Sequence, residues 1–170
     1  MHHVRIIGVL NVTPDSFHDG GKFLDVDIAL KRVVELVAQG ADILEIGGES
    51  TGPKSIDVSA EEELKRVLPI VSSVRSSFPD LPISVDTYKS EVARQVIELG
   101  VSMINDVTAG RGDRSMFDVV AKSNAKIVLM YAKDSTPRTT IAETPYKNVI
   151  ETIAQFLRLR RDKAIESGIT

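Results

Sequence analysis

Short apolar runs alternate with longer stretches of helical period along the whole chain, and this alternation limits the possible folds more than any other feature. Each run is continuous and apolar, as strands are when both faces of a parallel sheet are covered. The five runs are Val4–Leu10, Asp42–Ile46, Ile83–Val85, Ser102–Ile104 and Lys126–Met130. The sequence therefore predicts five parallel strands, each followed by a helix.

The stretches between these runs have apolar residues at every third or fourth position, which is typical of amphipathic helices. Ser59 starts a capping-box pattern, Pro69 predicts a kink in the same helix, and Pro145 predicts the start of the last helix. The predicted helices are Val26–Gln39, Ser59 to at least Val74, Lys89–Leu99, Arg114–Lys122 and Thr144 to Gly168. The basic cluster Arg158, Arg160, Arg161 and Lys163 is interpreted as a solvated face.

Strict alternation leaves two architectures, an open doubly wound α/β sheet or a (βα)8 TIM barrel. No G-x-G-x-x-G fingerprint follows the first strand. Polar or otherwise distinctive residues follow every predicted strand, and barrels build their active sites at that edge, so the pattern favours the barrel. A full barrel takes about 250 residues, and this chain supplies five units. We therefore expect residues 1–170 to be the N-terminal portion of one barrel domain, with strands six to eight absent.

Composition excludes several classes of protein. The 170 residues include 21 basic and 24 acidic side chains, a formal charge of −3, which argues against a nucleic-acid binder. There is no cysteine, so disulfide scaffolds, thiol nucleophiles and cysteine metal sites are excluded. No apolar run approaches the roughly 18 residues of a membrane span, and the N-terminus lacks a signal-peptide pattern. We expect a cytoplasmic protein that binds neither nucleic acid nor membrane.

Six short motifs follow the predicted strands and together resemble those of the dihydropteroate synthases. The first is the heptad NVTPDSF at Asn11–Phe17. The others are Ile46–Thr51, Ile83–Thr87, Ile104–Val107, Val128–Met130 and Thr136–Thr139. One such motif is weakly specific, but six in this order across the whole chain are highly specific.

The resemblance implies a (βα)8 barrel that joins 6-hydroxymethyl-7,8-dihydropterin pyrophosphate to para-aminobenzoate. Pyrophosphate leaves with the assistance of Mg²⁺, and 7,8-dihydropteroate forms for folate biosynthesis. The resemblance also implies a homodimer when the protein is full length, and a target of sulfonamides.

Three residues match the family's pterin contacts. Asp86 and Asn105 match the pair that hydrogen-bonds the pterin edge. The chemistry agrees, because a carboxylate accepts two N–H bonds and a carboxamide both donates and accepts. Met130 matches the apolar contact to the pterin face, although plain core packing is an alternative role.

Five further residues match positions near the reacting groups. Asn11 matches the residue at the metal and the leaving pyrophosphate, and Thr51 matches a leaving-group contact. Phe17, Asp19 and Pro53 match loop residues that cover para-aminobenzoate. In the family's dissociative mechanism a cation develops on the pterin methylene, and Asp19 is placed to stabilise it.

The sequence departs from the family pattern at two kinds of position. Gly52 stands where the family usually has an Arg, and Lys54 is only a partial substitute because its charge is a hydrated point. Tyr131 replaces a common His. The family's Asp-Pro-Gly segment, a later Lys and an Arg–His pair are expected to follow Thr170, so the 170 residues alone are expected to be inactive.

Two other functions remain open at the level of sequence. A methyltetrahydrofolate–corrinoid methyltransferase shares the barrel and the Asp and Asn contacts to the pterin. It needs no pyrophosphate loop, so NVTPDSF argues against it. A non-catalytic pterin-binding fragment or subunit is the other alternative.

Overall fold

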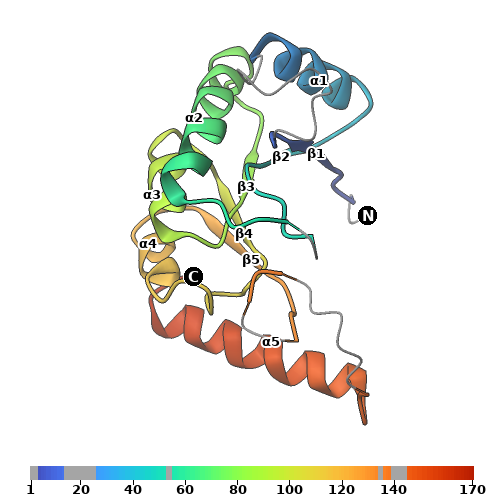
Figure 1. Cartoon of the computed structure of the whole chain (residues 1–170), viewed down its shortest axis with the longest axis vertical. Helices are drawn as coiled ribbons and strands as arrows, with labels where there is room; N and C mark the ends of the chain where they lie inside the picture. Colours follow the sequence, from blue (N-terminus) through green and yellow to red (C-terminus); the bar gives the residue numbers. More distant parts are fainter. Residues whose placement is uncertain (1–3, 14–25, 53–54, 134–135, 139–144) are drawn as a thin grey trace.

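In the computed structural model, five parallel strands form one sheet in the order β1-β2-β3-β4-β5, and a helix follows each strand (Figure 1). The structure describes residues 4–13, 26–52, 55–133, 136–138 and 145–170. The strands are β1 (Ile7–Asn11), β2 (Ile43–Gly47), β3 (Ile83–Asp86), β4 (Met103–Asp106) and β5 (Lys126–Leu129). The helices are α1 (Val26–Ala38), α2 (Ala60–Ser77), α3 (Ser90–Glu98), α4 (Met116–Ala121) and α5 (Val149–Glu166). Because spatial order follows chain order, the sheet is part of an α/β barrel, as predicted, and not a doubly wound sheet.

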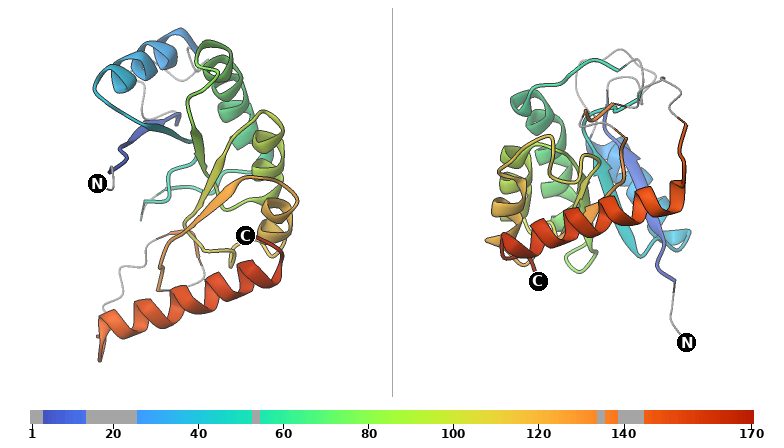
Figure 2. Two further views of the ribbon diagram at one scale, coloured as in Figure 1. Left: turned by 180° about the vertical axis from the view of Figure 1, so that it is seen from behind. Right: turned by 90° about the horizontal axis from the view of Figure 1, so that it is seen from below.

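Helices α1 to α4 pack side by side on one face of the curved sheet (Figure 2). Fully buried aliphatic side chains fill the space between this helix layer and the strands, among them Val33, Ile46, Val67, Val85 and Ile104. No described helix covers the opposite, inner face. Alternate residues of β1 are therefore exposed there, such as Val9, which is 52% exposed.

Of three predicted element boundaries, one is confirmed and two lie later in the sequence than expected. The Ser59 hydroxyl caps α2 by accepting from the Glu62 N–H, as the capping-box pattern predicts, and the helix continues through Pro69 to Ser77. α5 begins at Val149, later than predicted, and Asn148 caps the helix because its Oδ1 accepts the Glu151 N–H. β1 begins at Ile7, three residues later than expected.

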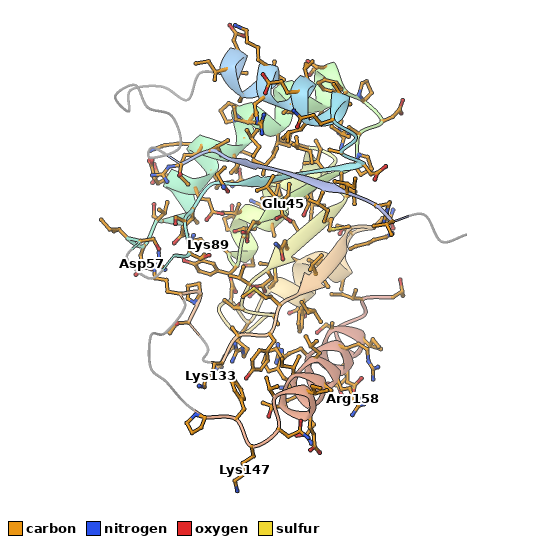
Figure 3. All side chains as sticks on the ribbon, turned by 90° about the vertical axis from the view of Figure 1, so that its right-hand side faces the viewer. Glu45, Asp57, Lys89, Lys133, Lys147 and Arg158 are labelled. Atoms are coloured by element: carbon orange, nitrogen blue, oxygen red, sulfur yellow. The ribbon has the colours of Figure 1, made fainter. Side chains whose placement is uncertain are left out.

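The basic cluster of α5 is only partly a solvated face. Arg158, Arg161 and Lys163 are exposed, and Figure 3 shows Arg158 on the helix surface. Arg160 is buried, because its Nε donates to the Ala109 carbonyl at 2.6 Å and its guanidinium lies over the Phe117 ring. Arg160 thus joins α5 to the segment after β4. Within the described ranges, no helix combines the length and apolar character needed to cross a bilayer.

Candidate active site

The carboxyl ends of the first four strands bring predicted site residues into one row. Asn11 pairs in register with Gly47, Gly47 with Asp86, and Asp86 with Asn105. Neighbouring strands lie about 4.8 Å apart, and side chains at paired positions of a parallel sheet project from the same face. Positions that are more than 90 residues apart in sequence, such as Asn11 and Asn105, therefore share one edge and one face of the sheet.

Gly47 keeps the row open between Asn11 and Asp86. A Cβ built on Gly47 would lie 3.2 Å from the Asn11 Oδ1 and 3.8 Å from the Asp86 Cβ. A larger residue at this position would occupy the space that the two polar side chains face. The Val12 N–H donates to the Gly47 carbonyl at 2.8 Å and fixes the end of β1 beside β2.

Asp86 is the acidic member of the row. Burial raises its pKa to about 7, and the negative charges of Glu45, Glu63, Asp106 and Glu49 add to the rise. Within the described ranges, no N–H or O–H group donates a hydrogen bond to its carboxyl group. Helix α3 begins after Lys89, so Asp86 caps no helix. The side chain is therefore free to accept hydrogen bonds from a ligand.

Asn105 and Asp106 have separate roles. Asn105 is half-buried on the inner face beside Asp86. Its backbone carbonyl accepts the Thr87 N–H at 3.0 Å. Asp106 is fully buried and accepts from the Thr108 N–H, the Thr108 hydroxyl and the Gly110 N–H. Asp106 therefore shapes the turn after β4, which leaves Asn105 as the side chain available to a ligand.

Met130 and Thr51 lie just beyond the ends of β5 and β2. Met130 is 43% exposed beside the open edge of the sheet, and its two alternative roles, pterin contact and core packing, stay predictions. Thr51 is half-buried. Its neighbour Gly52 holds the turn, because the Gly52 carbonyl accepts from the Ser55 N–H and the Ser55 hydroxyl.

Three predicted site residues, Phe17, Asp19 and Pro53, lie outside the described residues, as does Lys54. Their roles stay predictions. A further prediction, a metal at Asn11, concerns a described residue. In the described ranges no group of three or more His, Asp and Glu side chains is placed to hold a metal ion. The amide oxygen of Asn11 is one oxygen donor at this edge, and it fits a Mg²⁺ ion held mainly by phosphate oxygens and water.

The structure adds an ion-pair cluster that sequence reasoning did not assign. Glu49, after β2, accepts from Lys89 at the start of α3 and from Arg138 after β5. The Glu63 carboxylate of α2 accepts a second hydrogen bond from the same Lys89 ammonium group. Figure 3 labels Lys89 of this cluster, and also Asp57, whose carboxylate pairs with Arg138. Glu49 and Arg138 lie within two of the six family motifs, which could have pointed to them. Lys89 and Glu63 lie in none of these motifs.

Burial and pairing move the pKa values within this cluster in different directions. Burial alone would raise the pKa of Glu49, but hydrogen bonds from Lys89 and Arg138 together outweigh it and hold the pKa below its usual value. Burial dominates at Glu63 and raises its pKa. Lys89 has a raised pKa, because its two carboxylate partners outweigh the effect of burial. The cluster therefore holds Lys89 charged beneath the strand edge.

Comparison with known proteins places the chain among pterin enzymes. Residues 7–170 match the family described as pterin binding enzyme. A dihydropteroate synthase of Staphylococcus haemolyticus is 49% identical over 169 residues, which cover 99% of this chain and 60% of the relative. The chain thus spans about three fifths of that relative's length.

Two solved structures share the fold. A Clostridium difficile dihydropteroate synthase, crystallised in the presence of pteroic acid, superposes with a TM-score of 0.90 at 40% identity, covering 99% of this chain and 61% of that one. A Xanthomonas albilineans dihydropteroate synthase with 4-aminobenzoic acid has a TM-score of 0.88 at 39% identity, covering 99% and 59%. Both similarities extend over nearly the whole of this chain.

Proposed function

The chain belongs to the pterin binding enzyme family, and on that premise we propose that it supplies the first five βα units of a dihydropteroate synthase. The proposed reaction condenses 6-hydroxymethyl-7,8-dihydropterin pyrophosphate with para-aminobenzoate and releases pyrophosphate. We propose with it that Mg²⁺ assists, that the full-length enzyme is a cytoplasmic homodimer, and that later strands complete the site.

The observation that carries the proposal is the row formed by Asn11, Gly47, Asp86 and Asn105. A pterin edge presents ring N–H, amino and carbonyl groups in a rigid line. The Asp86 carboxylate accepts N–H bonds, and the Asn105 carboxamide both donates and accepts. A site of this kind rejects analogues that lack the pattern, because its half-buried polar groups are then left unpaired.

The second substrate is proposed to bind beside the residues that follow β2. The Xanthomonas relative was crystallised with 4-aminobenzoic acid, which supports a site for this acid in the same fold. Gly52, where the family usually has an Arg, lies beyond the end of β2, the strand that carries Gly47 in the row. The bond between the pterin methylene and the pyrophosphate oxygen breaks, the amine nitrogen of the acid then bonds to the methylene carbon, and the amine loses a proton.

Asn11 is the described residue that fits a magnesium ion. Its amide oxygen lies 3.2 Å from the position that a Cβ on Gly47 would take, and it would hold the ion together with phosphate oxygens of the substrate. When bound, the ion neutralises charge that develops on the leaving pyrophosphate. Asn11 orients that group, while Asp86 and Asn105 hold the pterin so that its methylene faces the second substrate. Asp19 is proposed to stabilise the cation on the methylene by its negative charge.

The proposal is tested by assaying the complete enzyme, with whatever residues its reading frame adds to these 170. With Mg²⁺ and both substrates, we expect dihydropteroate and pyrophosphate in equal amounts. The Asp86→Ala variant should lose roughly 1.5–3 kcal/mol of pterin binding by calorimetry, because a charge-assisted hydrogen bond is removed.

Asp118→Ala is the matched control, because Asp118 is exposed on α4 and faces no site residue. Its pterin affinity should equal that of the wild type. Unchanged affinity in Asp86→Ala would remove Asp86 from the site. Methyl transfer from methyltetrahydrofolate to a corrinoid, without dihydropteroate formation, would support the methyltransferase alternative instead.

A further inference from the structure

Arg138 makes three contacts with the segment that follows β2, and the proposed function leaves these contacts without a role. Its Nε donates to the Ser55 carbonyl at 3.1 Å, and its Nη2 donates to the Glu49 Oε1 at 2.7 Å. Its Nη1 pairs with the Asp57 carboxylate. Arg138 comes from the segment after β5, 89 residues from Glu49 in sequence, so one side chain joins two strand-end segments.

The shape of the guanidinium group explains why an arginine does this. Its N–H donors lie in one plane and point in fixed directions, so one group can bind three acceptors at once. The Arg138 side chain is only 18% exposed, and the Glu49 side chain is 3% exposed. Water therefore competes weakly for the Arg138–Glu49 pair, whereas Asp57 is 86% exposed and its contact is solvated.

Arg138 supplies the second positive charge beside the two buried carboxylates of the cluster. Glu49 and Glu63 carry two buried negative charges, and Lys89 and Arg138 carry two positive ones. Lys89 pairs with both carboxylates, and the Tyr88 hydroxyl also donates to Glu49. Without Arg138, one ammonium group would face two buried carboxylates. The cost of the uncompensated buried charge would then favour rotation of the Glu49 side chain toward solvent.

Movement of Glu49 would move the substrate-facing residues of the same segment. Glu49 is two residues from Thr51, and its Oε1 also accepts the Val58 N–H at 3.4 Å. The contacts of Arg138 with Glu49 and Ser55 thus hold both sides of the turn at Thr51 and Gly52. Asp86 and Asn105 lie on strands and are fixed by the sheet instead.

We propose that Arg138 is a positioning residue for the second substrate, holding Glu49 and Ser55 so that the turn at Gly52 lies correctly beside para-aminobenzoate. This inference rests on the proposed function and goes further by assigning a role to the Thr136–Arg138 motif. Arg138 acts through Glu49 and Ser55 and need not touch either substrate. Loss of Arg138 affects para-aminobenzoate use more than pterin use.

The kinetic test compares Arg138→Met and Arg138→Lys in the complete enzyme. Both should raise the KM for para-aminobenzoate about tenfold or more, because neither side chain reproduces three directed hydrogen bonds. The KM for the pterin pyrophosphate should change less than twofold at saturating para-aminobenzoate. Full rescue by Arg138→Lys would show that only charge matters, and an equal rise in both KM values would show general misfolding. Either result would overturn the positioning role.

Two further variants supply a control and a test of additivity. Arg94→Met is the matched control, because Arg94 pairs only with Glu91 and Glu98 of its own helix among the described residues. Its kinetics should equal those of the wild type. Asp57→Asn, at an exposed position with little risk to folding, should raise the same KM modestly. It should have no further effect when combined with Arg138→Met, and additive effects would contradict a shared role.

Hydrogen exchange separates failure of this inference from failure of the proposed function. The Ser55 and Val58 amides bond within the segment that Arg138 holds, to the Gly52 carbonyl and to Glu49. Their exchange should accelerate in Arg138→Met and not in Arg94→Met, whether or not the protein makes dihydropteroate. Unchanged exchange would overturn the contact as a restraint. Faster exchange with an unchanged KM for para-aminobenzoate would overturn its role in positioning.

Discussion

At the scale of single residues, the chemistry of Asp86 depends on its surroundings. Burial raises the pKa of the carboxyl group toward neutral pH. The charges of four acidic neighbours, Glu45, Glu63, Asp106 and Glu49, raise it further. None of these four is adjacent to Asp86 in sequence. A pterin that donates N–H bonds favours the ionised form, so ligand binding and proton loss are coupled.

Pterin affinity is therefore expected to rise with pH through about 7, the pKa of Asp86 in the unliganded protein. Below that value the affinity should fall by up to about tenfold per pH unit, because a proton must leave before the carboxylate accepts hydrogen bonds. Calorimetry from pH 5.5 to 8.5 measures this, and buffers of different ionisation enthalpy report the proton released. In Asp86→Asn the dependence should disappear, and its persistence would assign it to another group.

The same pKa has a consequence for stability. The native protein holds a proton on Asp86 up to about pH 7, whereas an unfolded chain releases it near the ordinary value of 3.8. At this group the native state thus binds more protons between these values, so the contribution of Asp86 to stability falls as pH rises from about 4 to 7 and then levels off. Denaturant unfolding at pH 5 and pH 8 should show Asp86→Asn gaining stability relative to the wild type at the higher pH. Equal differences at both values would contradict the raised pKa.

At the scale of elements, the distance between β2 and α2 depends on one glycine. A Cβ on Gly48 would lie 2.7 Å from the Val67 Cγ1 and 3.0 Å from the Glu63 Cγ, both on α2. Gly48→Ala should lower the free energy of unfolding by about 1–3 kcal/mol, as overpacking does elsewhere. Gly52→Ala is the matched control, because among the described residues its Cβ meets nothing closer than the Ser50 Oγ at 3.6 Å. Equal stability of the two variants would show that α2 shifts without cost.

The residue at position 52, in the turn after β2, is also expected to affect the binding of the second substrate. Gly52 has room for a side chain, and it supplies no charge where the family usually has an Arg. Gly52→Arg should lower the KM for para-aminobenzoate and leave the KM for the pterin substrate nearly unchanged, because a guanidinium pairs with a carboxylate. Gly52→Met, which adds length without charge, should not reproduce the gain. If steady-state kinetics show no change in Gly52→Arg, another group already binds the carboxylate.

At the scale of the whole molecule, the described sheet has two open edges and an uncovered inner face. β1 and β5 each pair on one side only among the described strands. Val9, Val128 and Met130 are 52%, 39% and 43% exposed at these edges. Unpaired strand groups and apolar surface of this kind promote association.

The 170 residues expressed alone should therefore aggregate or self-associate and release no pyrophosphate from the pterin substrate. Sedimentation velocity measures the first property, and a coupled pyrophosphate assay measures the second. The complete enzyme, assayed in parallel, is the positive control. A monodisperse 170-residue monomer that turns over substrate would show that five units suffice.

The sequence by itself determined the order of strands and helices and the row of polar residues at the strand ends. Both follow from local signals, because apolar periodicity and caps such as Ser59 act within a few residues of themselves. Parallel strands then bring Asp86 and Asn105 to one edge without further information. The role of Asp106 as the structural neighbour was also predictable, since an Asp after a strand commonly accepts backbone N–H groups.

Only the tertiary structure decided which distant groups meet. Arg160 has the same sequence context as its solvated neighbours, and it is buried because the Ala109 carbonyl and the Phe117 ring lie beneath α5. The contact between Arg138 and Glu49 likewise joins segments after β5 and β2 that no local pattern connects. Burial raises the pKa of Asp86, and the charges of Glu45 on β2 and Glu63 on α2 add to the rise. Burial and Coulomb interactions depend on distances in space, and these exist only once the chain has folded.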